Sequence, residues 1–530
     1  MNALVEARRA AIPLKDPQLF RDRAYVDGQW AEADSRKRFD VDNPADGAVI
    51  GAVPDMGAAE TRRAIEAANA ALPAWRALPA KERSKILRKW FDLIVASADD
   101  LALLLTTEQG KPLAEAKGEI LYGASFVEWF AEEAKRVYGD VIPSPTGDRR
   151  LIVIKQPIGV VAAITPWNFP NAMITRKVAP GLAVGCTVVL KPAEQTPFSA
   201  LALAELAERA GFPKGVLNIV TGSDAPAIGK ELCANPTVRK LTFTGSTEVG
   251  RKIGALAGEH LQTACLELGG KNPMVVTPSA DLDLAVEGAL FAGFGTAGQR
   301  CTSLGTVIVH ESVHDEFLRR YTAAVKDAAV GDPAGDVVMG PLLDQKFADR
   351  YEEFLTWVQP HHTVIGATGR IGADNPREGF TGGDPADGLF YHPVVVDGVR
   401  PGDAIFDTET FGPLVGIATY TSFDEAIQLA NAPGYGLSSA IYTNDPKEVF
   451  AFRRGISAGM VSVNNSTSGA EAHLPFGGNG KSGNGSRQSG MWVLDQFTRW
   501  QSMNWDYSGK LQKAQMDVAE LVPDSQFQLS

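Results

Sequence analysis

The sequence of 530 residues contains few cysteines and few histidines. Its four cysteines are Cys186, Cys233, Cys265 and Cys301. They are too few and too scattered for a disulfide framework or a Cys-x-x-Cys metal site, and they favour a reducing, cytoplasmic setting. The seven histidines are dispersed apart from the adjacent His361 and His362, and no set has the spacing of a zinc site. The sequence therefore predicts no metal.

Excess positive charge and long apolar runs are lacking too. The chain has 51 Lys and Arg against 63 Asp and Glu, a formal net charge of -12 at pH 7. An acidic surface repels the phosphates of nucleic acids and anionic lipids. No apolar run reaches the roughly 18 residues of a membrane span, and the first 16 residues mix charges where a secretory signal would be apolar. We expect no nucleic-acid partner, no membrane insertion and no export.

What is present is an ordinary globular composition, with 45% hydrophobic and 22% charged residues, long enough for two to four domains. From about residue 56 to 135, apolar residues recur at steps of three and four, as in amphipathic helices that pack on a larger body. We expect this stretch to serve packing and to carry no chemistry.

Beyond Pro143, short β-rich runs alternate with longer helical ones. The strand candidates are LIVIK, GVVAAIT, TVVLK, VLNIV and KLTFTG. This alternation predicts a doubly wound parallel sheet, which binds ligands at the carboxyl ends of its strands. A second α/β stretch follows from about 270 to 475, with an irregular surface excursion at 366–390, and residues 508–530 are typical of a polar tail. The sequence thus predicts two α/β domains with a cleft between them.

Cys301 has surroundings that indicate chemistry. In GFGTAGQRCTS a helical run ends in small residues and leaves the thiol beside the cationic Arg300. An exposed thiol next to a cation has a lowered pKa and can attack a carbonyl carbon as a thiolate. The alternative is a buried structural cysteine, because a free cysteine is most often a small hydrophobic residue.

Two further polar side chains follow strand candidates. Glu267, in CLELGGKNP, could act as a general base toward water, or it could be a solvated glutamate at a strand end. Asn168, in ITPWNFP, is surrounded by prolines that would hold its amide in place. A fixed amide could stabilise an oxyanion together with a backbone N–H, and the alternative is an Asn turn without a catalytic role.

Two segments could bind a dinucleotide. FTGSTEVG, residues 243–250, places Gly245 and Ser246 where a strand passes into a helix, so N–H groups there could bind a pyrophosphate; a simple tight turn is the alternative. In KPAEQTP, Lys191 and Glu194 could bond ribose hydroxyls. A carboxylate at the 2′-hydroxyl would repel a 2′-phosphate, so the sequence favours NAD over NADP.

Seven segments, in one order over nearly the whole chain, together resemble the aldehyde dehydrogenase superfamily. They are TPWNFP, KPAEQTP, FTGSTEVG, LELGGKNP, GQRC, ETFGP and PFGGNGKSG. The resemblance implies an α/β fold with a Rossmann-type cofactor domain, a second α/β catalytic domain and a bridging β segment. It also implies a small-molecule aldehyde substrate that is oxidised to an acid through a thioester.

The resemblance implies domain bounds as well. The NAD-binding domain would comprise 1–138 and 159–266, the catalytic domain 267–475, and the bridging segment 139–158 and 490–506. Bridging strands would otherwise be exposed edges, so a homodimer or homotetramer is expected.

Catalytic roles follow from the resemblance residue by residue. Cys301 would be the nucleophile, Glu267 the base, and Asn168 with the Cys301 N–H the oxyanion site, with Lys177 close by. Water is the expected acyl acceptor, because the branch that uses coenzyme A typically lacks the glutamate. The predicted cofactor-binding residues are Ile164, Thr165, Trp167, Lys191, Glu194, Gly222, Gly245, Ser246, Leu268, Glu409 and Phe411. Among these, Glu409 would bind the nicotinamide ribose and Phe411 would lie beside the ring.

The substrate is expected to carry a carboxylate. The first half resembles succinate-semialdehyde dehydrogenases, in which an arginine at the place of Arg176 helps bind the carboxylate, but the companion arginine expected six positions before the nucleophile is Gly295 here. NNSTSGAEAHLPFGG resembles the anchor loops of dehydrogenases for aminoadipate, ketoglutarate and glutamate semialdehydes. There Gly469 and Ala470 would donate N–H groups and Arg300 would lie near the acid tail. The alternatives are a surface or interhelix arginine and a plain Gly-Ser turn.

One more departure concerns Gln488, which stands where many members carry a glutamate linked to proton relay. A missing carboxylate could slow deacylation or be compensated elsewhere. Other hypotheses are a dehydrogenase of uncharged aliphatic or aromatic aldehydes, a cysteine hydrolase without a redox cofactor, and an inactive enzyme fold that serves as a scaffold. The scattered histidines disfavour the hydrolase, and the presence of Cys301, Glu267 and Asn168 disfavours the scaffold.

Overall fold

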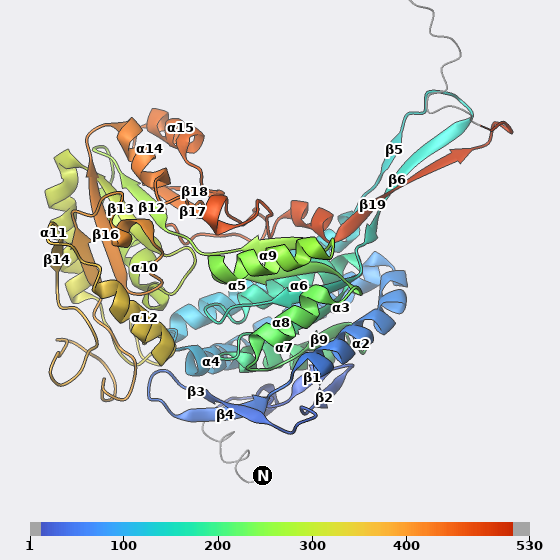
Figure 1. Cartoon of the computed structure of the whole chain (residues 1–530), viewed down its shortest axis with the longest axis horizontal. Helices are drawn as coiled ribbons and strands as arrows, with labels where there is room; N and C mark the ends of the chain where they lie inside the picture. Colours follow the sequence, from blue (N-terminus) through green and yellow to red (C-terminus); the bar gives the residue numbers. More distant parts are fainter. Residues whose placement is uncertain (1–11, 512–530) are drawn as a thin grey trace, which may run out of the picture.

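A computed structural model of the chain describes residues 12–511 (Figure 1). Most of the N-terminal segment in which we expected no secretory signal, and most of the predicted polar tail, lie outside the described residues. In the described part, no helix is both long enough and apolar enough to cross a membrane.

The stretch predicted to be helical forms four helices beside the first sheet (Figure 1). They are α2 (Ala58–Ala77), α3 (Ala80–Ala96), α4 (Ala98–Gln109) and α5 (Leu113–Glu133). The inward stripe of α3 buries Leu87, Trp90 and Ile94, and the Trp90 indole donates to the carbonyl of Leu203 at 3.1 Å. The amphipathic pattern thus packs these helices as predicted.

The first sheet has seven strands in the order β11-β10-β7-β8-β9-β1-β2. Their bounds are β1 (Ala24–Val26), β2 (Gln29–Ala31), β7 (Val160–Ile164), β8 (Thr187–Lys191), β9 (Leu217–Ile219), β10 (Val238–Thr244) and β11 (Thr263–Glu267). The helices between them are α6 (Ala172–Val184), α7 (Pro197–Ala210), α8 (Ala225–Ala234) and α9 (Thr247–Glu259). Strands β7 to β11 are parallel, and the chain passes from β7 outward to β9 before it returns to β10 on the other side of β7. The doubly wound sheet is confirmed, with its switch point between β7 and β10.

The second sheet follows in sequence, in the order β14-β15-β16-β13-β12-β17-β18. Its strands are β12 (Asn272–Val276), β13 (Leu304–His310), β14 (Thr363–Ile365), β15 (Val394–Asp397), β16 (Leu414–Tyr420), β17 (Ser438–Tyr442) and β18 (Met460–Val463). Its helices are α10 (Leu282–Phe294), α11 (Glu311–Asp327), α12 (Gln345–Leu355), α13 (Ala404–Asp407), α14 (Phe423–Asn431) and α15 (Pro446–Gly455). All neighbouring strands are parallel except β14 and β15. Residues 366–390 contain no helix or strand, in keeping with the predicted excursion.

A three-stranded antiparallel arm projects from the body (Figure 1). It comprises β5 (Asp140–Ile142), β6 (Arg149–Pro157) and β19 (Thr498–Asp506), and β6 pairs with β19 from Pro157↔Thr498 to Arg149↔Asp506. Residues Met491–Gln496 form a 3₁₀ helix instead of the expected strand, because Val493 and Leu494 turn into the core. A small hairpin of β3 (Arg38–Asp42) and β4 (Val49–Pro54) lies near the N-terminus. The division into domains stays a prediction, and Glu267 is the last residue of β11 in the first sheet.

Candidate functional site

A groove of ≈ 580 Å³ lies at the carboxyl ends of the first sheet and reaches Cys301. It is lined by ten of the eleven predicted cofactor-binding residues, which are Ile164, Thr165, Trp167, Lys191, Glu194, Gly245, Ser246, Leu268, Glu409 and Phe411. The eleventh, Gly222, is not among the lining residues. A Cβ at Gly222 would lie 2.4 Å from the Met56 carbonyl oxygen, so this glycine allows close packing.

At one end of the groove, the features suit the adenosine and pyrophosphate parts of a dinucleotide. Ser246 caps α9 by accepting a hydrogen bond from the Val249 N–H at 3.3 Å, and the free N–H groups of such a helix start favour phosphate. Lys191 pairs with Glu194 at 3.2 Å where β8 ends. Four further cations, which the sequence motifs did not indicate, line the groove from α8, α9 and α12. They are Lys230, Lys252, Lys346 and Arg350, which have no motif around them.

Two aromatic rings and one carboxylate line the groove together with Cys301. The Phe411 ring meets Trp167 edge-on at 5.5 Å, and Phe411 has a left-handed backbone with φ 53. Glu409 accepts a hydrogen bond from the Gly270 N–H at 2.9 Å, and burial raises its pKa to about 7. The groove therefore combines a phosphate-binding end and a flat aromatic end next to a thiol, which fits a nicotinamide dinucleotide.

The Cys301 thiol differs from the sequence prediction. The residue is 8% exposed, and burial raises the pKa of its thiol to about 11, although Arg176 opposes this rise. Arg300 does not activate it, because the Arg300 guanidinium pairs with Glu115 at 2.6 Å. The prediction of an exposed thiol beside a free cation was wrong. The buried thiol is therefore held in its protonated form.

Glu267 is not the solvated glutamate of the alternative interpretation, because it is 1% exposed. Burial raises its pKa to about 8, although Arg176, Lys177 and Arg487 pull the value down. Within the described residues neither carboxylate oxygen has a well-formed hydrogen bond, although the Gly478 N–H lies close enough to favour the charged form. A carboxyl poised near neutral pH with free oxygens can exchange a proton with a water molecule.

Lys177 lies beside this carboxyl on the buried face of α6. Its ammonium donates to the Thr244 hydroxyl and to Gln488 Oε1, the latter at 3.1 Å. Burial, with the neighbouring Arg176 charge, lowers the Lys177 pKa to about 7. Gln488 therefore supplies a neutral acceptor to this lysine.

Asn168 is held by contacts that prolines alone would not supply. Its Nδ2 donates to the backbone carbonyl of Gln299, two residues before Cys301, at 2.9 Å. The backbone carbonyl of Asn168 accepts a hydrogen bond from Lys111 Nζ at 2.8 Å. The side chain lines the groove, and Oδ1 has no partner in the described part of the chain. The amide is therefore directed at the loop that contains Cys301.

Arg176 is a buried cation, 1% exposed, and not a surface arginine. Its guanidinium stacks over Phe476 at 3.9 Å from the ring centre and lowers the pKa of the Tyr122 hydroxyl, which burial otherwise raises. No carboxylate of residues 12–511 lies within ion-pair distance of it. Its charge acts on both Cys301 and Glu267. A buried cation without a fixed acid partner suits an anionic ligand.

The predicted anchor loop also reaches this region. Ala470 packs against Cys301, Leu437 and Phe476. Neither Gly469 nor Ala470 has a partner for its N–H in the described part, and the nearby Ser468 hydroxyl is buried without one. Arg300, in contrast, pairs with Glu115, and its contact with an acid tail stays a prediction.

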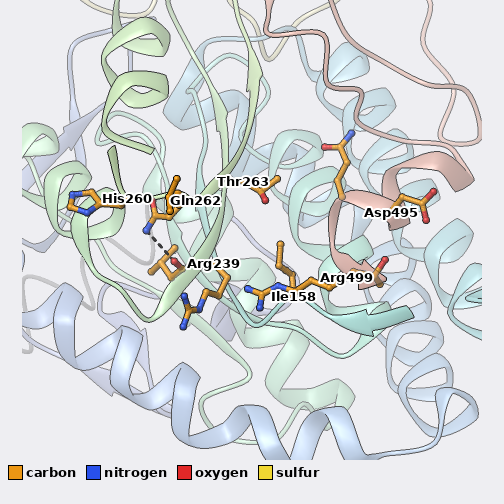
Figure 2. Close-up of a pocket in the computed structure, with 11 residues that line it drawn as sticks. Ile158, Arg239, His260, Gln262, Thr263, Asp495 and Arg499 are labelled. Atoms are coloured by element: carbon orange, nitrogen blue, oxygen red, sulfur yellow. Dashed lines mark hydrogen bonds between the residues drawn. The ribbon is translucent and has the colours of Figure 1, made fainter. Parts of the chain in front are cut away.

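A second hollow, of ≈ 280 Å³, lies at the opposite edge of the first sheet, where β10 and β11 begin (Figure 2). It includes Arg239, Thr263 and Arg499. None of the residues singled out from the sequence lines it.

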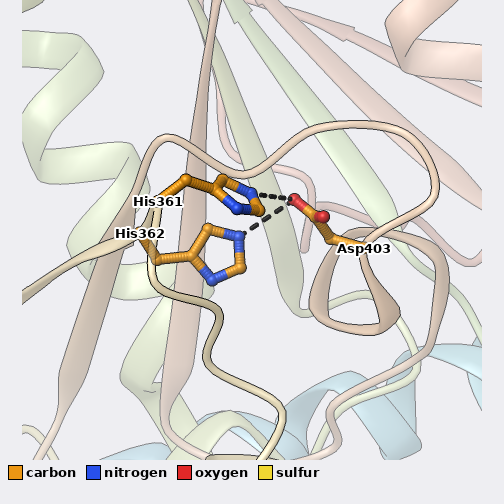
Figure 3. Close-up of side chains that lie close together, drawn as sticks. All are labelled: His361, His362 and Asp403. Atoms are coloured by element: carbon orange, nitrogen blue, oxygen red, sulfur yellow. Dashed lines mark hydrogen bonds and ion pairs between the residues drawn. The ribbon is translucent and has the colours of Figure 1, made fainter.

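One group of three side chains in the described part could reach a common metal ion: His361, His362 and Asp403 (Figure 3). The Nε2 atoms of both imidazoles are within hydrogen-bond distance of Asp403 Oδ2, at 3.0 and 2.9 Å. However, His362 Nδ1 accepts from the Gln359 N–H at 2.9 Å, so the neutral ring carries its proton on Nε2 and has no lone pair there for a metal. The cluster therefore links two loops by hydrogen bonds.

Comparisons with known proteins agree with this geometry. A sequence model described as "Aldehyde dehydrogenase family" matches residues 30–503. The chain is 51% identical to a glutarate-semialdehyde dehydrogenase of Pseudomonas aeruginosa, over 91% of this chain and 97% of that protein. It is 49% identical to a succinate-semialdehyde dehydrogenase (NADP(+)) of Escherichia coli, with the same coverage of 91% and 97%. The crystal structure of succinate-semialdehyde dehydrogenase from Burkholderia pseudomallei is similar with a TM-score of 0.88 and 46% identity, over 93% of this chain and 100% of that one.

Proposed function

Because this chain belongs to the aldehyde dehydrogenase family, we propose that it oxidises a carboxylate-bearing semialdehyde to the acid, with NAD, through a thioester on Cys301. One observation carries the proposal. The groove that holds a helix start and the Lys191–Glu194 pair at one end reaches Cys301 and Asn168 at the other, where Glu267 is close enough to affect the thiol pKa.

The first step is addition of the Cys301 sulfur to the aldehyde carbon. A new S–C bond forms and the carbonyl oxygen becomes an oxyanion, while the S–H bond breaks and the thiol proton passes to solvent water. Asn168 Nδ2 and the Cys301 N–H would hold that oxyanion. One N–H of the amide nitrogen already donates to the Gln299 carbonyl, and the second would donate to the substrate oxygen. Because the thiol pKa is about 11, proton removal has to accompany attack.

The groove residues would hold the dinucleotide. Lys191, Glu194 and Ser246 suit its adenosine and phosphate end, and Glu409 and Phe411 its nicotinamide end. When bound, oxidised nicotinamide supplies the acceptor for the hydride that leaves the substrate carbon. Glu267 would then draw a proton from water, which attacks the thioester carbon, breaks the C–S bond and releases the acid.

The proposal that the substrate carries a carboxylate rests on Arg176, which would bind it. It is a buried guanidinium with no carboxylate partner within the described residues, and it lies next to Phe476 in the cluster around Cys301. The unpaired N–H groups of Gly469 and Ala470 would add donors. Relatives named for glutarate and succinate semialdehydes, at 51% and 49% identity, support this class of substrate.

The preference for NAD rests on Glu194. A carboxylate at the end of β8 would accept a bond from a 2′-hydroxyl and repel a 2′-phosphate. Two lysines would favour a 2′-phosphate instead: Lys191 pairs with Glu194 and offsets its charge, and Lys230 also lines the groove. The Escherichia coli relative is named for NADP(+).

We also propose a homodimer or homotetramer. The arm exposes large apolar side chains, with Trp500, Met503 and Trp505 being 54%, 47% and 61% exposed. Strand β18 leaves an open edge on the second sheet. An exposed apolar arm and an open edge are surfaces that association covers.

The catalytic roles are tested with Cys301→Ala and Glu267→Gln. The first should abolish aldehyde-dependent NADH formation, and the second should lower kcat by about 10²- to 10⁴-fold and accumulate acyl-enzyme, visible by intact-protein mass spectrometry. Burial raises the Glu267 pKa to about 8, so wild-type deacylation should speed up as pH rises through that value, and Glu267→Gln should remove the dependence. Cys186→Ala, at a buried thiol far along the chain, is the control. Turnover by Cys301→Ala would refute the mechanism.

The substrate class is tested with Arg176→Met, assayed on glutarate semialdehyde, succinate semialdehyde and uncharged pentanal. Loss of a charged hydrogen bond should lower kcat/KM for the semialdehydes by about 100-fold more than for pentanal. The ratio is the measured quantity, because Arg176 also affects the Cys301 pKa and so every aldehyde. If Arg176→Met leaves the ratio of kcat/KM for semialdehyde to that for pentanal unchanged, or if the wild type prefers pentanal, the proposal of a carboxylate-bearing substrate is contradicted.

Cofactor choice is tested by kcat/KM for NAD and NADP in the wild type and in Glu194→Ser. We expect the wild type to prefer NAD and the variant to shift toward NADP by about tenfold or more, because the charge that repels a 2′-phosphate is gone. A wild-type preference for NADP would overturn this part of the proposal and leave the aldehyde chemistry intact.

Assembly is tested by light scattering after gel filtration. The wild type should have two or four times the chain mass of 56.5 kDa. Trp500→Glu combined with Trp505→Glu should lower that mass, because charges would face the covered surface. A monomeric wild type would refute the assembly.

A further inference from the structure

The chain just before Cys301 has an unfavourable backbone conformation. Thr296, Ala297 and Gly298 are all left-handed, with φ of 50, 53 and 70. Side chains with a Cβ rarely adopt this conformation, so contacts from outside the loop have to maintain it.

Glu115 supplies those contacts. It lies in the first turn of α5, and its carboxylate accepts from the Thr296 N–H at 3.0 Å, from the Thr296 hydroxyl, and from Arg300 Nη2 at 2.6 Å. Burial alone would raise the Glu115 pKa, but the charges of Arg300 and Lys111 hold it below its usual value. One carboxylate thus holds both ends of the segment 296–300.

Gly295 belongs to the same arrangement. A Cβ at this position would lie 2.6 Å from Arg300 Nη2. Succinate-semialdehyde dehydrogenases were expected to carry a second arginine at this position. Here the Arg300 guanidinium, which pairs with Glu115, fills the space that a side chain at position 295 would need.

The same part of the chain holds the other oxyanion donor. Lys111 donates to the Asn168 carbonyl at 2.8 Å and pairs with Glu119, one helical turn after Glu115. Glu119 in turn accepts from the N–H groups of Asn171 and Ala172 at 2.9 and 3.2 Å, where α6 begins. Glu115 therefore holds the loop of the nucleophile, and the Lys111–Glu119 pair holds the turn of the amide.

We propose that Glu115 is a positioning residue for Cys301, acting through Thr296 and Arg300, and that the start of α5 sets the spacing between the Cys301 N–H and the Asn168 amide. The inference rests on the proposed function for its effect on turnover. Its effect on the loop does not depend on any substrate.

The test compares Glu115→Gln and Glu115→Ala with the wild type. The control is Glu231→Ala, which removes another partly buried carboxylate that pairs with an arginine, Arg62. Iodoacetamide is the probe, and peptide mass spectrometry follows alkylation at each of the four cysteines. Cys186 and Cys233, both 0% exposed, report unfolding.

We expect both Glu115 variants to alkylate at Cys301 about tenfold faster than the wild type, because a released loop lets water reach the thiol, with Cys186 and Cys233 still protected. With an accepted semialdehyde, kcat should fall by about 100-fold and KM for NAD should stay within about twofold. The control should change neither.

Glu115→Gln keeps the side-chain shape, and so provides the folded variant if Glu115→Ala loses protection at all four cysteines. If Cys301 in folded Glu115→Gln is alkylated at the same rate as in the wild type, the proposal is overturned. Faster alkylation without a kcat change in an active enzyme would overturn it as well, because the loop would then not matter for turnover. Failure of the dehydrogenase proposal is recognised separately, by turnover in Cys301→Ala.

Discussion

Burial of ionisable groups around one thiol is the constraint on which this site depends. Removal from water raises the pKa of Cys301 to about 11 and of Glu267 to about 8, and it lowers that of Lys177 to about 7. Arg176 reduces the penalty for both acids and increases it for the lysine. Each group is thereby moved toward the uncharged form, which suits a site where charge has to develop during a reaction and not before it.

Such a cluster needs a rigid surround, and the structure supplies it from both sides. Strand ends of the first sheet carry Glu267 and Lys191, whereas Glu409, Phe411 and the loop with Cys301 come from the chain that forms the second sheet. Helix α5 joins them through Glu115 and Glu119. The helical period of residues 56–135 predicts packing, and it shows which face is buried. It does not show which buried carboxylate meets a distant loop.

The two departures from the family pattern now have a physical setting. Gly295 leaves room for the guanidinium of Arg300, which pairs with Glu115. Gln488 gives Lys177 a neutral acceptor, and the acidic groups that oppose the fall in its pKa are Cys265, Glu267 and Cys301.

The amino-acid sequence by itself determined the doubly wound sheet, the strand ends that carry Lys191, Ser246 and Glu267, and the resemblance that singled out Cys301. Strand and helix periods and short motifs are local, so they can be recognised without coordinates. Only the tertiary structure decided that the Cys301 thiol is buried, that Arg300 turns away to Glu115, and that Gly222 does not line the groove. These properties depend on solvent exclusion and on charges from residues as far as 185 positions apart, which no local pattern records.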